Sequence, residues 1–242
     1  DLLDRVAQVP GLSRIRLSSL HPEDVTPRLM DVFAAHPNLL PHLHLSLQSG
    51  SDTVLRRMAR PYTADEFRAK VALVRSHLDR PALTTDIIVG FPGETDAEFD
   101  ETLALAKEVA FAKMHVFAFS SRKGTAAAKM RPKVPSDAIK ARSQTLRNLD
   151  RDLQTQFRDQ FLGETAQVLI ESQDGCLTGR AERYFEVEIG HETYGTDGTN
   201  RTSPPDGQSH TSYGSYASYS SGDIVTVRLA RNAHNAVLAT IA

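Results

Sequence analysis

The sequence predicts an α/β protein in which a parallel sheet is followed by a small all-β barrel. Three observations support this fold class. Apolar runs typical of buried strands alternate with helical patterns through residues 1–134. One amphipathic helical pattern then covers residues 135–162, and after residue 163 the apolar positions repeat every two residues. We therefore expect a sheet domain at 1–134, a long connecting helix at 135–162 and a β-barrel domain at 163–242.

The first domain alternates helices with strands. The patterns predict helices at 2–9, 22–33, 53–59, 63–78 and 96–109, and strands at 14–20, 42–47, 87–89 and 113–119. Right-handed crossovers make such strands parallel, in a barrel or in an open sheet. Four strands do not close a TIM barrel, which needs eight. Because Asp1 falls inside a helical pattern, we expect an N-terminally truncated chain and a partial, six-stranded, TIM-like barrel.

Polar residues mark several helix ends. Thr63 and Glu66 have the spacing of a capping box, and Glu94 stands where the next helix is expected to open. Ser136 is the predicted cap of the long helix, and Gly163 is its predicted end.

The last 80 or so residues contain five short strand patterns. These lie at 165–171, 177–180, 184–189, 224–229 and 236–241, which suits a small barrel of the oligonucleotide-binding kind. The stretch 190–222 is rich in Ser, Thr, Gly and Tyr and poor in aliphatic residues, so we expect it to be a disordered insertion between strands.

Composition excludes several classes of protein. The 242 residues have a net charge of −2, no run of 18 apolar residues and no secretory leader, so we expect a cytoplasmic protein without a membrane span. Cys176 is the only cysteine, so the chain cannot form an internal disulfide or a cysteine-ligated cluster. It follows a turn without a flanking base, and we expect an inert thiol.

Two strand ends contain groups that could bind a ligand. Gln48 and Ser49 follow one strand, and their amide and hydroxyl suit ribose hydroxyls or an amino-acid carboxylate. The alternative is a simple helix-capping turn. Gly90 follows the next strand between the acids Asp86 and Glu94, and it would allow close approach of a ligand. Here the alternative is a plain connecting turn.

A basic loop follows the fourth strand. Residues 112–131 contain five Lys or Arg, among them Arg122 and Lys123, and no acid, which suits a phosphate backbone but also a solvated loop. His42 and His44 lie two apart on one strand face, but no third ligand is evident nearby. We therefore expect them to be structural and predict no metal site.

Four segments together resemble the radical SAM methylthiotransferases. In chain order they are RIRLSSLHP at 14–22, HLHLSLQSGSD at 42–52, TDIIVGFPGET at 85–95 and HVFAFSSRKGTAAA at 115–128. The last of these is closest to the branch that modifies threonylcarbamoyladenosine in tRNA. LTGRAERY at 177–184 is similar to the C-terminal TRAM domain of that family.

The resemblance implies a mechanism. A 4Fe-4S cluster cleaves S-adenosylmethionine (SAM) to a 5′-deoxyadenosyl radical, a second 4Fe-4S cluster supplies sulfur, and a second SAM supplies the methyl group. An electron donor must reduce the cluster. The product has a methylthio group on C2 of adenosine 37, in the anticodon stem-loop of tRNA.

The resemblance also implies site residues. SAM would contact Gln48, Ser49, Gly50, Asp86, Ile88, Gly90, Glu94, Phe117 and Phe119, and tRNA would contact Arg122, Lys123 and Arg180.

The chain departs from the family pattern in ways that affect activity. The CxxxCxxC loop is absent, so we expect no catalytic residue in this chain and no activity of the chain alone. Ser46 replaces the usual proline, and Ala118-Phe119 replaces Pro-Tyr. Other hypotheses are a methylthiotransferase for isopentenyladenosine in tRNA or for a ribosomal-protein aspartate, an ordinary phosphate-binding α/β-barrel, and a non-catalytic module that binds tRNA or SAM.

Overall fold

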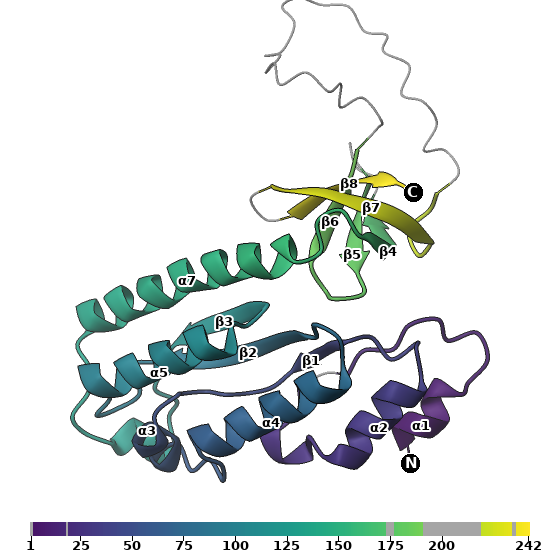
Figure 1. Ribbon diagram of the computed structural model, residues 1–242. Helices are drawn as coiled ribbons and strands as arrows, with labels where there is room; N and C mark the ends of the chain where they lie inside the picture. The colour runs from purple at the N-terminus through teal and green to yellow at the C-terminus, as the bar shows by residue number, and fades with distance from the viewer. Residues whose placement is uncertain (1, 18, 173–176, 191–218, 234–235) are drawn as a thin grey trace, which may run out of the picture. The chain divides into compact units, whose positions relative to one another are not determined.

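The computed structural model divides into two compact units. It describes residues 2–17, 19–172, 177–190, 219–233 and 236–242 (Figure 1). The first unit is Asp1–Gln160 and the second is Phe161–Ala242. Cys176 and most of the predicted insertion at 190–222 lie outside the described residues.

The first unit is an α/β arrangement, as predicted. Its three strands form one parallel sheet in the order β1-β2-β3, flanked by helices (Figure 1). The helices are α1 (Leu2–Ala7), the 3₁₀ turn η1 (Pro22–Asp24), α2 (Pro27–Ala35), α3 (Asp52–Arg57), α4 (Ala64–His77), α5 (Asp96–Val109), α6 (Ala126–Lys129) and α7 (Ser136–Asp159), and the strands are β1 (His42–His44), β2 (Ala82–Val89) and β3 (Lys113–Ala118).

The predicted strand at 14–20 is much reduced in the structure. Of its residues, Ile15 and Leu20 form isolated parallel bridges, to Leu39 and Leu45. The segment therefore lies beside β1 without a continuous ladder. Its apolar residues Ile15, Leu17 and Leu20 pack against the core but are only partly buried, so the segment is held less firmly than the strands of the sheet.

Alternate residues of the sheet face two different environments. On β2, Thr85, Ile87 and Val89 are fully buried, whereas Asp86 and Ile88 are only partly buried. The buried side packs against α4, α5 and α7 in one core, which includes Phe67, Phe111 and Leu146. Helices thus cover one face of the sheet. The other face, called the open face below, contains the partly buried positions.

Helix caps explain where most helices begin. The capping box of Thr63 and Glu66 is confirmed, with Glu66 N to Thr63 Oγ1 at 3.2 Å. Helix α5 uses a second capping box, of Thr95 and Glu98. The prediction that Glu94 opens this helix was wrong, because its carboxylate turns back to the strand end. Ser136 is the first residue of α7 rather than its cap, which is Pro135.

The second unit is a closed five-stranded barrel, as the period-two pattern predicted. Its order is β4-β5-β6-β8-β7, and β6 and β8 run parallel while the other pairs are antiparallel. The strands are β4 (Thr165–Ser172), β5 (Leu177–Ala181), β6 (Glu186–Ile189), β7 (Ile224–Ala233) and β8 (Ala236–Ile241). Closure removes the exposed strand edges that an open sheet of this size would leave.

Within the described residues, no helix combines the length and the apolar character needed to cross a membrane.

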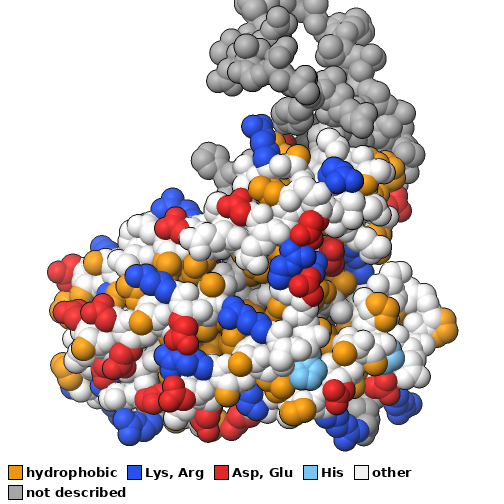
Figure 2. All heavy atoms as spheres, viewed as in Figure 1, with side chains coloured by type: hydrophobic (Ala, Val, Ile, Leu, Met, Phe, Trp, Pro, Cys, Tyr) orange, Lys and Arg blue, Asp and Glu red, His pale blue; other side chains and the backbone are white. Residues whose placement is uncertain are grey.

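On the face shown in Figure 2, acidic and basic side chains are interspersed over the first unit. Long-range attraction of a polyanion would therefore depend on local basic segments rather than on the net charge of −2.

Close packing in the barrel leaves no room for a side chain at Gly179 in β5. A Cβ at this position would lie 2.2 Å from the carbonyl oxygen of Leu169 on β4. We predict that Gly179→Ala lowers the stability of the barrel by about 1–3 kcal/mol, because backbone must move to admit the methyl group. Amide hydrogen exchange in β4 and β5 measures this loss.

Gly190→Ala is the matched control for this prediction. The nearest atom to a Cβ at Gly190 is the carbonyl oxygen of Ala239, at 4.0 Å, so exchange should hardly change. Equal protection in the two variants would contradict the proposed close packing at Gly179.

Candidate functional site

The candidate site is the edge of the sheet where β1, β2 and β3 end. Gln48 follows β1 and forms an isolated parallel bridge with Ile87 of β2. Gly90 follows β2, and the amide of Phe119, after β3, donates to the carbonyl of Val89 at 2.8 Å. The three predicted segments therefore meet at one edge, which is where open α/β sheets bind their ligands.

Gln48 is held in an unusual backbone conformation. Its φ of 66° lies in the left-handed region, which costs a non-glycine residue of the order of 1–3 kcal/mol. Two backbone hydrogen bonds to β2 fix it there, Gln48 N to Asp86 O at 2.8 Å and Ile88 N to Gln48 O at 2.9 Å. The side chain is 7% exposed, and its amide forms no hydrogen bond with the described residues. A buried, uncommitted amide is suited to binding a polar ligand.

Ser49 and Gly50 pack against helix α5 instead of pointing to the strand edge. The hydroxyl of Ser49 lies 3.1 Å from Thr102 Oγ1, and the amide of Gly50 donates to the same oxygen at 2.9 Å. A Cβ at Gly50 would lie 2.6 Å from the Cα of Thr102. The requirement for glycine therefore arises from helix packing. The side chain of Ser49 is completely buried and already bonded.

Tyr62 fixes the strand end just before Gln48. Its hydroxyl donates to the carbonyl oxygens of Ser46 at 2.7 Å and Leu47 at 3.2 Å. Burial raises the pKa of Tyr62 to about 12, so the phenol remains a donor at neutral pH. The sequence reasoning did not identify this residue.

A buried ion pair organises the turn after β2. Glu94 Oε2 accepts a hydrogen bond from the amide of Gly90 at 2.7 Å and one from Arg142 Nη1 of α7 at 2.8 Å. The side chains of Glu94 and Arg142 are 1% and 8% exposed. Burial raises the pKa of the Glu94 carboxyl, while the amide of Gly90 and the guanidinium of Arg142 act in the opposite direction. Glu94 Oε2 thus holds this turn.

Arg142 has further partners on the same turn. Its Nη1 lies 3.2 Å from the carbonyl of Glu94, its Nη2 lies 2.6 Å from Asp96 Oδ1, and its guanidinium lies 5.5 Å from the ring centre of Phe99. The sequence reasoning missed this residue, because 48 positions separate it from Glu94. Its spacing of three from Ile139, which puts both on one helix face, was the available signal.

A pocket of about 200 Å³ lies between this turn and the start of α7. It is lined by Gly90, Pro92, Phe119, Ser121, Lys133, Val134 and Ile139. A Cβ on Gly90, whose φ is 78°, would lie 2.4 Å from Ile139 Cγ1. The close approach that requires glycine is therefore made by Ile139, and the ligand space lies beside it. Phe119 is held against Phe91 with ring centres 5.2 Å apart.

The open face contains the other predicted contact residues. Asp86 is paired in register with His115, and Ile88 with Phe117, so all four point to this face. Phe117 is 52% exposed, which is unusual for so large an apolar side chain. The structure thus divides the predicted SAM contacts between two places, the strand edge and the open face.

His44 also lies on the open face, beside Asp86. Its Nδ1 lies 3.0 Å from Thr84 Oγ1, and its Nε2 lies 3.3 Å from Asp86 Oδ2. The sequence reasoning found no third potential ligand near His42 and His44. The structure corrects this, because parallel pairing brings Asp86 and His115 next to His44.

The predicted tRNA contacts fall in different units. Arg122 and Lys123 are exposed in the loop after β3, just before the short helix α6. Arg180 is on β5 of the barrel, with its guanidinium 4.9 Å from the ring centre of Tyr184 and its Nε 3.2 Å from Glu171 Oε1. The basic loop is therefore available to solvent, while Arg180 is already engaged.

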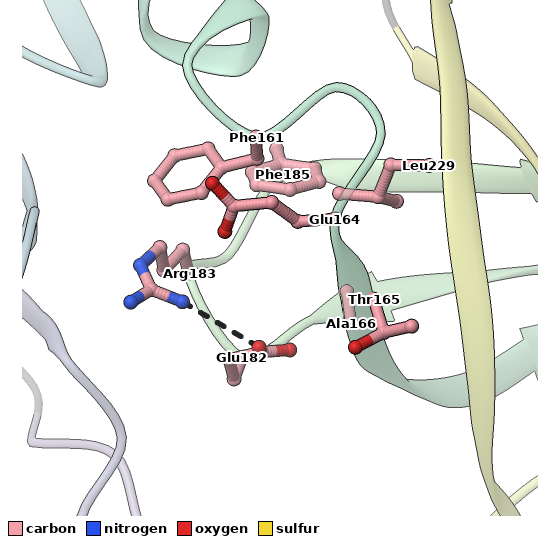
Figure 3. A pocket seen from close by; sticks show the side chains of 8 residues that line it. All are labelled: Phe161, Glu164, Thr165, Ala166, Glu182, Arg183, Phe185 and Leu229. Carbon is pink, nitrogen blue, oxygen red and sulfur yellow. Dashed lines mark hydrogen bonds and ion pairs between the residues drawn. The ribbon is translucent and has the colours of Figure 1, made fainter.

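The barrel has a small cavity at the start of β4. In Figure 3 the rings of Phe161 and Phe185 lie side by side, with ring centres 5.8 Å apart, and Arg183 pairs with Glu182. The cavity is about 10 Å³, which holds no more than one water molecule. We therefore assign it to packing.

Comparison with known proteins places the chain in a family. Residues 2–106 match the Radical SAM superfamily, so this part of the chain belongs to that class. Within that class its relatives are tRNA methylthiotransferases, and the chain is a homologue of these proteins.

Three relatives illustrate this. Threonylcarbamoyladenosine tRNA methylthiotransferase MtaB of Thermotoga maritima is 43% identical over 191 residues, which cover 78% of this chain and 44% of that protein. The tRNA-2-methylthio-N(6)-dimethylallyladenosine synthase of Polynucleobacter asymbioticus is 40% identical over 200 residues, which cover 81% of this chain and 45% of that protein. The same synthase of Thermobifida fusca is 42% identical over 200 residues, which cover 78% of this chain and 40% of that protein. The chain thus spans less than half the length of these relatives.

Solved structures show weaker similarity. Coproporphyrinogen III oxidase (HemN) from Escherichia coli, described as a radical SAM enzyme, aligns with a TM-score of 0.48 and 18% identity, covering 58% of this chain and 32% of that one. The radical SAM methyltransferase TsrM from Kitasatospora setae aligns with a TM-score of 0.40 and 16% identity, covering 48% of this chain and 23% of that one.

The Glu94–Arg142 pair leads to a prediction about stability. Arg142→Met leaves the buried Glu94 carboxylate with the Gly90 amide but without its counter-ion. We expect the free energy of unfolding to fall by about 3–5 kcal/mol, the usual cost of removing one partner of a buried ion pair. Urea unfolding followed by helical circular dichroism reports this loss, because the described helices all lie in the first unit.

Two further variants test the cause. Arg147→Met, on an exposed position of the same helix, should change stability by about 0.5 kcal/mol or less. The double variant Arg142→Met/Glu94→Gln should recover part of the loss, since no charge is then left unpaired. A double variant no more stable than Arg142→Met would argue against the buried charge as the cause.

Proposed function

We propose that the protein containing this chain is a radical SAM tRNA methylthiotransferase that adds a methylthio group to C2 of threonylcarbamoyladenosine at position 37. The supporting observation is the 43% identity with Thermotoga MtaB over 78% of this chain. Because the chain spans 44% of that relative, the activity is proposed for the whole protein. The choice of threonylcarbamoyladenosine as the substrate rests on the amino-acid sequence of residues 115–128. Overall identity does not decide it, since the dimethylallyladenosine synthases are nearly as similar to this chain.

The two units suit two roles in such an enzyme. We propose that residues 1–134 are the C-terminal part of a six-stranded radical SAM barrel and that 163–242 form a TRAM-like barrel, joined by the helix at 135–162. The parallel sheet, extended by the bridges at Ile15 and Leu20, supports the first assignment. The closed five-stranded barrel supports the second.

The strand edge fits SAM in several respects. The buried amide of Gln48 can bond to ribose hydroxyls or to the methionyl carboxylate, and the pocket at Gly90 and Phe119 offers an apolar wall for a flat adenine. Asp86, Ile88 and Phe117 on the open face would border the same ligand. Bound SAM supplies the 5′-deoxyadenosyl radical and the methyl group. The chain's own contribution is to bind and orient SAM.

Ser49, Gly50 and Glu94 have a supporting role in this proposal. Ser49 and Gly50 bond to Thr102, and Glu94 bonds to the Gly90 amide, so each helps to shape the edge. The residues present do not fit a 4Fe-4S cluster, because one cysteine cannot supply its thiolates. We therefore propose that the chain alone is inactive and that the two clusters and the electron donor act on the whole protein.

The tRNA partner would meet the exposed basic loop. Arg122 and Lys123 can neutralise phosphates of an anticodon stem-loop, and the barrel with Arg180 offers a second, β-sheet surface. Dividing the contacts between the two units suits a folded RNA, which is bound by shape and backbone as much as by base.

The decisive experiment is mass spectrometry of tRNA nucleosides from cells with and without the gene that encodes this sequence. We predict that 2-methylthio-threonylcarbamoyladenosine disappears in the deletion, that its unmethylthiolated precursor accumulates, and that the intact gene restores the product. Unchanged product would reject the proposal for this nucleoside. Loss of the methylthio form of isopentenyladenosine would indicate the other tRNA branch, and unchanged tRNA would direct attention to a ribosomal-protein aspartate.

Gln48 provides a test of the SAM site in the full-length protein. Gln48→Ala should weaken SAM binding by about tenfold, the effect of losing a hydrogen bond to a charged or hydroxyl group. Isothermal titration calorimetry measures the affinity. Gln144→Ala, an exposed glutamine bonded to Asn148 on α7, is the matched control and should bind SAM normally. Equal affinity of the two variants would remove Gln48 from the site while leaving the family unaffected.

A further inference from the structure

The open face brings together three side chains that could act as metal ligands. His44 of β1, Asp86 of β2 and His115 of β3 each offer one ligand atom, and these atoms lie within 4.8 Å of one another. His44 Nε2 lies 3.3 Å from Asp86 Oδ2, and the rings of His44 and His115 have centres 5.9 Å apart. His44 and Asp86 are 42 residues apart in the sequence, and Asp86 and His115 are 29 apart, so only folding places them together.

The strand register explains why they meet. His44 pairs with Thr84, and Asp86 pairs with His115, in a parallel ladder. Paired residues in such a ladder point to the same face, and adjacent strands lie about 4.8 Å apart. Three neighbouring strands therefore present two imidazoles and a carboxylate side by side on a rigid support, which is the arrangement that precise ligand geometry requires.

His44 is oriented as metal-binding histidines commonly are. Thr84 Oγ1 lies 3.0 Å from Nδ1 of His44, which turns Nε2 toward Asp86. Nε2 is buried and makes no hydrogen bond with the described residues. A hydrogen-bond partner on one ring nitrogen fixes the orientation of the ring, and it favours coordination by the other nitrogen.

We propose that His44, Asp86 and His115 bind a divalent transition-metal cation such as Zn²⁺. Two imidazoles and one carboxylate are a ligand set that suits Zn²⁺ and its first-row neighbours. Three protein ligands leave at least one coordination position open for water or for an oxygen atom of a ligand. The three residues are all partly exposed. The proposal goes beyond the methylthio transfer proposed above and does not depend on it, although Asp86 also borders the proposed SAM site.

The test uses the untagged 242-residue chain and Zn²⁺ or Co²⁺ as the probe. We expect one tightly bound Zn²⁺ per chain in competition with a chromophoric chelator, and Co²⁺ absorption typical of four- or five-coordinate nitrogen and oxygen ligation. Asp86→Asn and His44→Gln should each weaken binding by at least about tenfold. His77→Gln, which changes a histidine on α4 outside the cluster, should leave the affinity unchanged.

A second readout needs no variant and identifies the site directly. The chain has nine histidines, so ¹⁵N NMR of the imidazole rings must show which of them respond to Zn²⁺. The proposal requires large shifts at the ring nitrogens of both His44 and His115. Shifts confined to other histidines, affinity unaffected by Asp86→Asn and His44→Gln, or no Zn²⁺ uptake would each overturn it. In the last case the contact of His44 with Asp86 is a polar contact without a role in metal binding.

Discussion

The first unit depends on one buried ion pair, between Glu94 at the end of β2 and Arg142 on α7. Charges removed from water are tolerated only when they are paired and hydrogen-bonded. Glu94 satisfies this condition with the Gly90 amide as well as with Arg142, and Arg142 satisfies it with Asp96 as well. Any movement of α7 away from the turn would break several of these contacts at once. The position of the helix and the shape of the turn are therefore fixed together.

This coupling determines the pocket at the strand edge. Ile139, one turn before Arg142 on the same helix, fills the space beside Gly90 that a side chain would otherwise occupy. The pocket wall thus consists of strand ends on one side and α7 on the other. Phe119, packed edge-to-face against Phe91, completes the apolar part of this wall. A ligand here would contact a surface already fixed before it binds, which lowers the entropic cost of binding.

Local signals in the sequence predicted much of this fold. Apolar periodicity located the long helices and the five barrel strands, and the capping box at Thr63 and Glu66 marked the start of α4. Such signals work because helix and strand formation depend on residues close in sequence. The segment 14–20 was predicted less well, since its pairing depends on neighbours distant in sequence, which its own residues do not reveal.

The roles of individual site residues were harder to predict, because they depend on partners distant in sequence. Gly50 was predicted to contact SAM and Gly90 to allow close approach of a ligand, and the groups that a Cβ at these positions would meet are Thr102 and Ile139. Ser49 was proposed as a ligand contact, yet its hydroxyl is buried against α5. The sequence thus indicated where backbone and side chains are constrained. Only the fold shows which constraint is met by packing.

The open face and the strand edge are linked through β2. Asp86 and Gly90 are four residues apart on or just beyond this strand, which corresponds to about 13 Å. Parallel sheets usually have both faces covered, so a face that presents His44, Asp86 and an exposed Phe117 is exceptional for a sheet of this type. The strand edge and the open face therefore adjoin each other, because β2 leads directly into Gly90 at one and contributes Asp86 to the other.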